Sequence, residues 1–212
     1  MTTLVEGYHK IHLASMSGDV VAVFHSLKTS MEPDTLLSLK RKKDGVQAIH
    51  LAAERGHLKV LKLLLKYGAK LDARDKKGST ALHYACKEGR LRSATALLDT
   101  GAPKEAKDYR FGETPLHRAC AGGHRKVVDL LIARGSNPLS FSSAAETPAD
   151  VADFYGHETL ATYIRNTFPT KREQNRGEHV LQSPKKFDEG AGVAGSTKAG
   201  GERREVTFPS FS

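Results

Sequence analysis

Two histidine and cysteine pairs are the first candidates for chemistry in this chain of 212 residues: His83 with Cys86, and His117 with Cys120. Each cysteine follows its histidine by three residues, which places both side chains on one face of a helix. Imidazole and thiolate both bind zinc, but zinc sites normally combine ligand pairs at C-x-x-C or H-x3-H spacing. Neither pair has that spacing, so we expect no metal site here.

The same two cysteines are poor candidates for a disulfide, because they belong to separate units of an intracellular chain. Ala53 fills the equivalent place in another unit, which indicates a slot for a small residue at a close approach of helices. A free cysteine behaves there as a small apolar side chain. We interpret both cysteines as packing residues.

Catalytic motifs are missing from the sequence. There is no G-x-S-x-G nucleophile turn, no G-x-x-x-x-G-K-[ST] phosphate loop and no metalloprotease-type histidine pair. The stretch 190–195 has the glycine spacing of a dinucleotide fingerprint, but it follows no predicted strand and opens no predicted helix. We therefore expect neither an enzyme nor a cofactor.

The histidines recur in a phrase that repeats along the chain. An apolar residue, a histidine, a variable residue and an alanine are followed four residues later by glycine, and the histidines of the four phrases are His12, His50, His83 and His117. With a fifth unit that lacks the histidine, the glycines are Gly18, Gly56, Gly89, Gly123 and Gly156, at steps of 38, 33, 34 and 33 residues. Such a period is typical of a stacked repeat array.

One unit can be interpreted physically from its residues. Thr114 can cap a short helix, Pro115 fits its first turn, and Gly123 supplies a left-handed stop. A second helix follows, with apolar residues from Val127 to Ile132 on a broad face. A lone pair of helices cannot cover that face, so neighbouring units must stack.

The phrase resembles the ankyrin repeat, most fully over residues 112–120. This resemblance implies an all-α repeat solenoid of stacked helix-turn-helix units with projecting loops, about five repeats over residues 5–168, with divergent first and last capping repeats. It also implies that His12, His50, His83 and His117 are structural, since this imidazole hydrogen-bonds the turn and the capping threonine and so links units.

Three departures from the repeat mark special places. The first unit has a longer step, and in the last unit Asp150 replaces the histidine and Ala145 replaces the loop glycine, so both units are predicted to be caps. Between Gly101 and Gly112 there is one more residue than between Gly68 and Gly78. We therefore expect the loop with Tyr109, Arg110 and Phe111 to project differently from its neighbours.

Composition divides the chain into a repeat domain, residues 1–169, and a Gly/Lys-rich tail, residues 170–212, predicted to be disordered. The domain holds 25 of the 33 Lys and Arg residues and 18 of the 24 Asp and Glu residues. No signal peptide or membrane span is recognisable, so we expect a monomeric intracellular protein, cytoplasmic or nuclear. Ser183, followed by Pro184 and two lysines, is a candidate phosphorylation site.

The loops between units carry the candidate binding site. In the resembled fold they line a concave face together with the ends of the first helices. We expect that face to bind a protein partner through an acidic segment, with these contact residues: Arg41, Lys42, Lys43, Arg55, Arg74, Lys76, Lys77, Lys87, Lys107, Tyr109, Arg110 and Phe111. The alternative is a polyanion, either nucleic acid or an anionic membrane surface, attracted by the net charge of +9. Acidic residues interrupt each basic loop, which favours the protein partner.

Overall fold

The computed structural model describes residues 9–169 of the chain as one row of stacked helix pairs. Residues 1–8 and 170–212, which include the start of the first repeat, the whole predicted tail and Ser183, lie outside the described residues. In the part described, all regular structure is helical, as the repeat pattern predicts.

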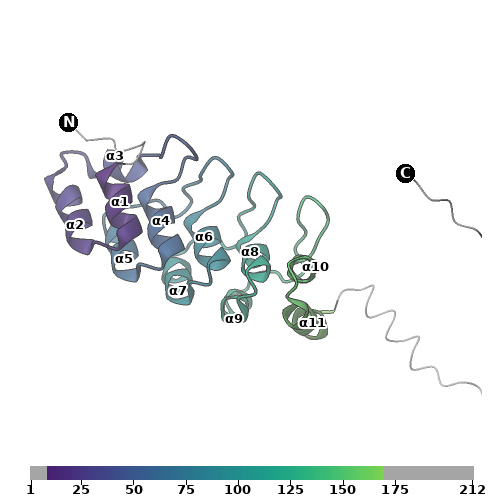
Figure 1. Cartoon of the computed structure of the whole chain (residues 1–212). Helices are drawn as coiled ribbons and strands as arrows, with labels where there is room; N and C mark the ends of the chain where they lie inside the picture. The colour runs from purple at the N-terminus through teal and green to yellow at the C-terminus, as the bar shows by residue number, and fades with distance from the viewer. Residues whose placement is uncertain (1–8, 170–212) are drawn as a thin grey trace, which may run out of the picture.

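The helices form two layers, and the loops project together from one side (Figure 1). The first helices of the five repeats make the inner layer: α1 (Lys10–Ser17), α4 (Ala48–Arg55), α6 (Ala81–Lys87), α8 (Pro115–Ala121) and α10 (Pro148–Phe154). The second helices make the outer layer: α2 (Val20–Thr29), α5 (Leu58–Lys66), α7 (Leu91–Asp99), α9 (Arg125–Ala133) and α11 (Glu158–Thr167). A short extra helix, α3 (Pro33–Ser38), fills the longer step of the first repeat.

Small side chains let the inner helices approach closely. Ala52, Ala85, Ala119 and Ala152 are completely buried, and so are Cys86 and Cys120. Burial raises the pKa of both thiols well above the ordinary value, so they stay protonated and are poor metal ligands. Among residues 9–169 no cluster of three or more His, Cys, Asp or Glu side chains could hold a metal ion.

Leucines and valines of the outer helices complete the core. Val60, Leu64, Leu97, Val128 and Leu131 are fully buried between the two layers. Each repeat therefore contributes apolar surface to one continuous core, and most of the stabilisation comes from burying that surface against the next repeat. None of the helices in the described stretch is long and apolar enough to cross a bilayer.

The loop of the last repeat contains an unfavourable backbone conformation. Ala145 has a φ of +59°, in the left-handed region, whereas the corresponding turns of other loops have glycine there, for example Gly78 with a φ of +78°. A Cβ in this conformation costs about 1–2 kcal/mol, although glycine loses more entropy on folding.

We therefore predict that Ala145→Gly stabilises the array by about 0.5–1 kcal/mol, because little packing is lost at this exposed position. Urea unfolding of the full chain measures the effect. Ala144→Gly, at the exposed neighbour without positive φ, is the control and is expected to be neutral or slightly destabilising. Equal changes in the two variants would show that the backbone of residue 145 is unstrained.

Candidate functional site: the loop-edge face

Buried histidines fix the position of each loop relative to the helix before it. The Nδ1 atom of His83 accepts a hydrogen bond from the Thr80 N–H at 3.1 Å, and its Nε2 atom lies 3.1 Å from the Glu113 carbonyl of the next loop. The same bridges join His12 to Leu39, His50 to Ala73 and His117 to Glu146, at 3.0–3.2 Å. Each imidazole thus connects a helix cap to the following repeat.

Because Nδ1 accepts from a backbone N–H, Nε2 must carry the proton and donate to the carbonyl. Burial lowers the pKa of His83 to about 4 and also lowers the pKa values of His12, His50 and His117. The four rings are therefore neutral at physiological pH. In the last repeat Asp150 replaces the imidazole, accepts from the Thr147 N–H at 2.9 Å and pairs with Arg165 of α11 at 2.8 Å.

A second series of polar side chains connects the repeats in the opposite direction, and the sequence interpretation missed it. The residue after each helix-ending glycine reaches back to a carbonyl of the preceding inner helix: His57 to Met16, Arg90 to Glu54, His124 to Lys87 and His157 to Ala121, at 2.9–3.2 Å. The only signal was the glycine-histidine dipeptide, which also fits a simple helix stop.

The side chain that reaches back also explains why the inner helix that it contacts is followed by a glycine. The ring of His124 lies over Gly89, where a Cβ would come within 2.6 Å of Nδ1. Gly89 therefore serves two purposes, since it ends the helix with a φ of +65° and leaves room for the next repeat's histidine.

Backbone hydrogen bonds join successive loop tips. The Lys76 N–H donates to the Asp44 carbonyl at 2.9 Å, the Tyr109 N–H to Lys77 at 2.7 Å, and the Ser143 N–H to Phe111 at 2.8 Å. In the second loop the incoming and outgoing bonds use adjacent residues, whereas in the third loop Arg110 lies between them. Arg110 thus occupies the place of the extra residue, and its exposed side chain projects from the tip.

Four of the predicted contact residues are engaged within the fold. Arg41 pairs with Asp44 of its own loop. The other three bind carbonyl oxygens of neighbouring loops: Arg74 that of Lys107, Lys76 those of Lys42 and Lys43, and Lys107 that of Phe141. Their positive charges stay near the surface, but their donors help to hold adjacent loops in register.

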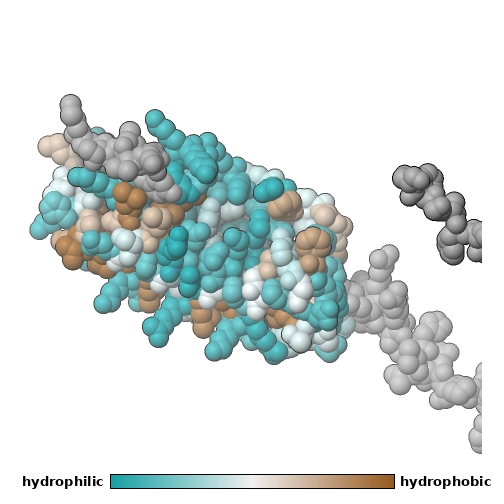
Figure 2. Space-filling view, viewed as in Figure 1, coloured by the Kyte–Doolittle hydropathy of each residue, from teal (hydrophilic) through white to brown (hydrophobic). Residues whose placement is uncertain are grey.

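Six predicted contact residues with basic side chains remain exposed on or beside the loops: Lys42, Lys43, Arg55, Lys77, Lys87 and Arg110. Lys87 lies 3.3 Å from Glu88, so its charge is partly balanced. Hydrophilic side chains cover the upper surface over the first loops, outside the grey region (Figure 2). We call the loop tips together with the exposed ends of the inner helices the loop-edge face.

The third loop adds an aromatic tip to this face. Tyr109 and Phe111 are 69% and 43% exposed. The ring of Tyr109 rests on Gly78, with the Arg74 guanidinium 5.2 Å from its centre. Phe111 lies between two guanidinium groups, with Arg110 at 4.8 Å and Arg118 at 5.8 Å.

Arg118, which the sequence interpretation did not single out, holds the base of this loop. It pairs with Asp108 at 2.5 Å and with Glu113 at 2.9 Å. The Asp108 side chain is inaccessible to solvent. Although burial alone favours its neutral form, hydrogen bonds from the Phe111 N–H and from Arg118 lower the pKa of Asp108. Tyr84 has the equivalent place in the preceding repeat and donates to Asp75 at 2.8 Å.

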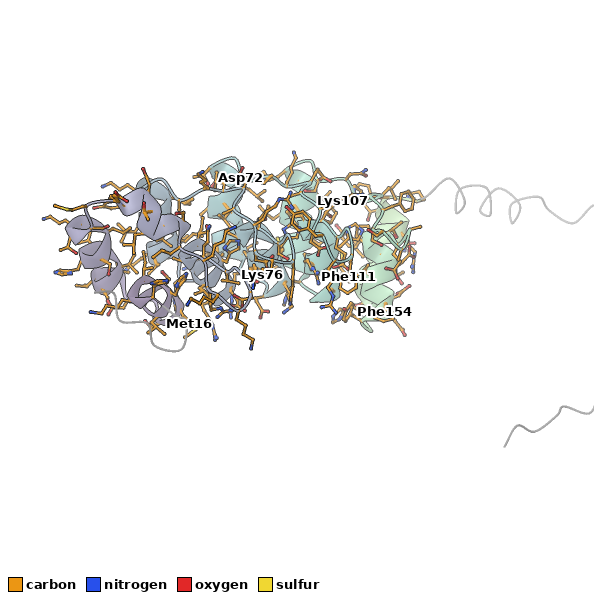
Figure 3. The ribbon with its side chains drawn as sticks, turned by 90° about the horizontal axis from the view of Figure 1, so that it is seen from above. Met16, Asp72, Lys76, Lys107, Phe111 and Phe154 are labelled. Atoms are coloured by element: carbon orange, nitrogen blue, oxygen red, sulfur yellow. The ribbon has the colours of Figure 1, made fainter. Side chains whose placement is uncertain are left out.

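A second aromatic pair extends the loop-edge face into the last repeat. Phe154 and Tyr155, at the end of α10, are 78% and 53% exposed, and their ring centres are 5.2 Å apart. The preceding repeat has the smaller residues Ala121 and Gly122 at the corresponding positions, so the aromatic pair is particular to the last repeat. Figure 3 shows Phe154 toward one long edge of the array and Asp72 and Lys107 at the other, with Lys76 and Phe111 between them.

This fold and surface define a helical repeat solenoid that presents an extended face. Two family models match the chain: "Ankyrin repeats (3 copies)" over residues 11–108 and "Ankyrin repeat" over residues 111–142. The chain belongs to the ankyrin repeat family, which supports a protein-interaction module.

Curated relatives include protein phosphatase 1 regulatory subunit 27 of Homo sapiens and of Mus musculus. Each is 44% identical to this chain over 109 residues, which is 51% of this chain and 49% of the relative. The chain spans about half the length of the curated relatives it matches.

The buried histidines predict a loss of stability in mild acid. As the pH falls below 6.5, the unfolded chain binds a proton at residue 83 while the folded chain does not, until the pH approaches about 4. At pH 5 this difference corresponds to about 2 kcal/mol for one imidazole. We predict that His83→Gln costs about 1–3 kcal/mol at pH 7.5 and also reduces the further loss on acidification.

Urea unfolding at pH 7.5 and pH 5 measures both effects. His25, exposed on α2, provides the control, and His25→Gln is expected to leave the stability at each pH unchanged. An acid loss that is as large in His83→Gln as in the unaltered chain would contradict the assigned role of this imidazole.

Arg118→Ala is predicted to destabilise the array by about 2–4 kcal/mol, because it leaves the buried Asp108 carboxylate without its cationic partner. Arg134→Ala is the comparison: Arg134 pairs with Asp99 at 2.6 Å, but both side chains are substantially exposed, so we expect a loss below about 1 kcal/mol. Thermal unfolding measures the two variants, and similar melting temperatures would argue against a special role for Arg118.

Proposed function

We propose that the array is a non-catalytic interaction module that binds an acidic segment of a protein partner along the loop-edge face. One observation carries the proposal: Lys42, Lys43, Lys77 and Arg110, from three successive loops, are exposed and lead to an aromatic tip. Stacking brings these residues to one edge, and their fields attract the same acidic partner.

The two halves of the face contribute differently to binding. Basic side chains over the first three loops accelerate association and select for acidic sequence. Tyr109, Phe111, Phe154 and Tyr155 supply apolar contact area of the kind that slows dissociation. The partner segment that fits has acidic residues at one end and apolar residues at the other.

The module can act as an adaptor, an inhibitor or an assembly chaperone, and the names of the relatives suggest one partner for it. Since two relatives are named as regulatory subunits of protein phosphatase 1, we propose a phosphatase of that class as a candidate partner. Isothermal titration calorimetry of the purified phosphatase catalytic subunit with the full chain tests this partner. Absence of heat at micromolar concentrations would remove the phosphatase while leaving open an acidic segment from another protein.

Polyanion binding is the second candidate, favoured by the same exposed lysines. Counterion release makes binding to nucleic acid fall steeply with salt concentration, whereas a complex anchored by aromatic rings retains much of its affinity. The exposed acidic side chain of Asp72 within the second loop disfavours a continuous polyanion track.

We predict that the combined variant Lys43→Glu, Lys77→Glu and Arg110→Glu slows association with an acidic partner about tenfold or more and leaves folding intact, since loop tips carry little packing. Adding Tyr109→Ala and Phe111→Ala to this variant is expected mainly to raise the dissociation rate constant. Surface plasmon resonance gives both rate constants, and circular dichroism checks the fold.

The matched control reverses three exposed lysines of the outer helices, Lys28, Lys59 and Lys126, and so makes the same change in net charge. Binding that weakens equally in the two triple variants would place the partner away from the loop-edge face.

A further inference from the structure

The outer layer contains an apolar groove that the loop-edge face does not involve. It lies between α5 and α7, neighbours in the outer layer in Figure 1, and has a volume of about 700 Å³. Leu58, Leu65, Leu91 and Ala96 line it, and Leu91 is 37% exposed. Exposed leucines in a groove on a surface helix are a common feature of docking sites.

The groove exists because α7 has small residues where the other outer helices have larger ones. Ala96 corresponds to Leu63 of α5 and to Leu130 of α9. Thr95 corresponds to Lys62 of α5, and its hydroxyl donates to the Leu91 carbonyl at 2.9 Å, so it offers no free donor to the groove. The floor is therefore apolar.

Basic side chains surround this floor. Lys62, Lys66 and Arg92 line the groove and are exposed, and within residues 9–169 none of them forms an ion pair. The acidic lining residue, Asp99, is paired with Arg134 at 2.6 Å. The groove thus combines an apolar floor with an unbalanced positive rim.

We propose that this groove is a second docking site and that its occupant is an acidic amphipathic helix. An apolar stripe of leucine-like residues would lie on the floor, and flanking glutamates or aspartates would meet Lys62, Lys66 and Arg92. Both walls are nine-residue helices, about 13 Å long, so an occupant of two to three turns fits. The site lies on a different layer from the loop-edge face, so one chain can hold two partners.

A synthetic helical peptide tests the site directly. The probe is a 14-residue amphipathic sequence whose leucines at i, i+3, i+7 and i+10 span about three turns, the length that fits the groove, with glutamates on both flanks. A second peptide has lysine at every glutamate position. Amide chemical shifts of the full chain are followed by NMR during titration to about 1 mM. We expect saturable shifts at α5 and α7 with the acidic peptide and none with the basic one.

Two variants of the chain confirm the contacts. Ala96→Leu fills the groove with the residue that two other repeats have at this position, so the fold is preserved, and it is expected to weaken binding about tenfold. The pair Lys62→Glu and Arg92→Glu is expected to do the same through the charges. The control pair, Lys59→Glu and Lys126→Glu, lies on the same layer outside the groove and is expected to bind normally.

Reversal of Lys43, Lys77 and Arg110 on the loop-edge face is expected to leave this binding unchanged, which separates the groove from the function proposed above. The proposal is overturned if the acidic peptide fails to bind, if its shifts map to the loops, or if the filled groove of Ala96→Leu binds as well as the open one.

Discussion

The arrangement of the whole surface depends on the hydrogen bond from a buried imidazole to a carbonyl of the next loop. His50, His83 and His117 each hold their own helix cap through Nδ1 and the following repeat through Nε2. Hydrophobic burial supplies most of the stability but is not directional. These bridges fix the spacing of the loops, and with it the spacing of the charges that the loops carry.

The need to hydrogen-bond the carbonyl oxygens between stacked loops also limits which basic side chains are available to a partner. Stacked loops leave carbonyl oxygens facing their neighbours, and Arg74, Lys76 and Lys107 satisfy them. Neighbours along the chain such as Lys77 and Arg110 remain free to contact other molecules. The loop-edge face therefore mixes residues that build it with residues that can bind. Because its basic side chains lie over the first loops and its apolar end is at Phe154 and Tyr155, the two ends of the face differ.

Much of this fold could be predicted from the sequence, because all five repeats carry the glycine that ends the first helix, four of them carry the histidine, and all steps after the longer first one are 33 or 34 residues. The sequence does not predict which basic loop residues bind neighbouring loops and which stay available to a partner. Lys76 and Lys77 are chemically alike and adjacent, and only stacking decides which of them meets a carbonyl. Phe154 and Tyr155 could not be predicted, because an aromatic pair at the end of a helix fits a packed core as well as an exposed surface, and only the structure shows both rings exposed. The groove beside Ala96 could not be predicted either, because it depends on how closely α5 and α7 pack around one small residue.

The nitrogen-15 chemical shifts of the histidine rings test the central claim most directly. If the bridges are as described, His12, His50, His83 and His117 show the Nε2–H tautomer, and the pKa of each ring lies below the ordinary value, for His83 at about 4. Rings that exchange between tautomers and take up protons near pH 6.5 would contradict the account, because such imidazoles could not be holding a buried carbonyl of the next repeat.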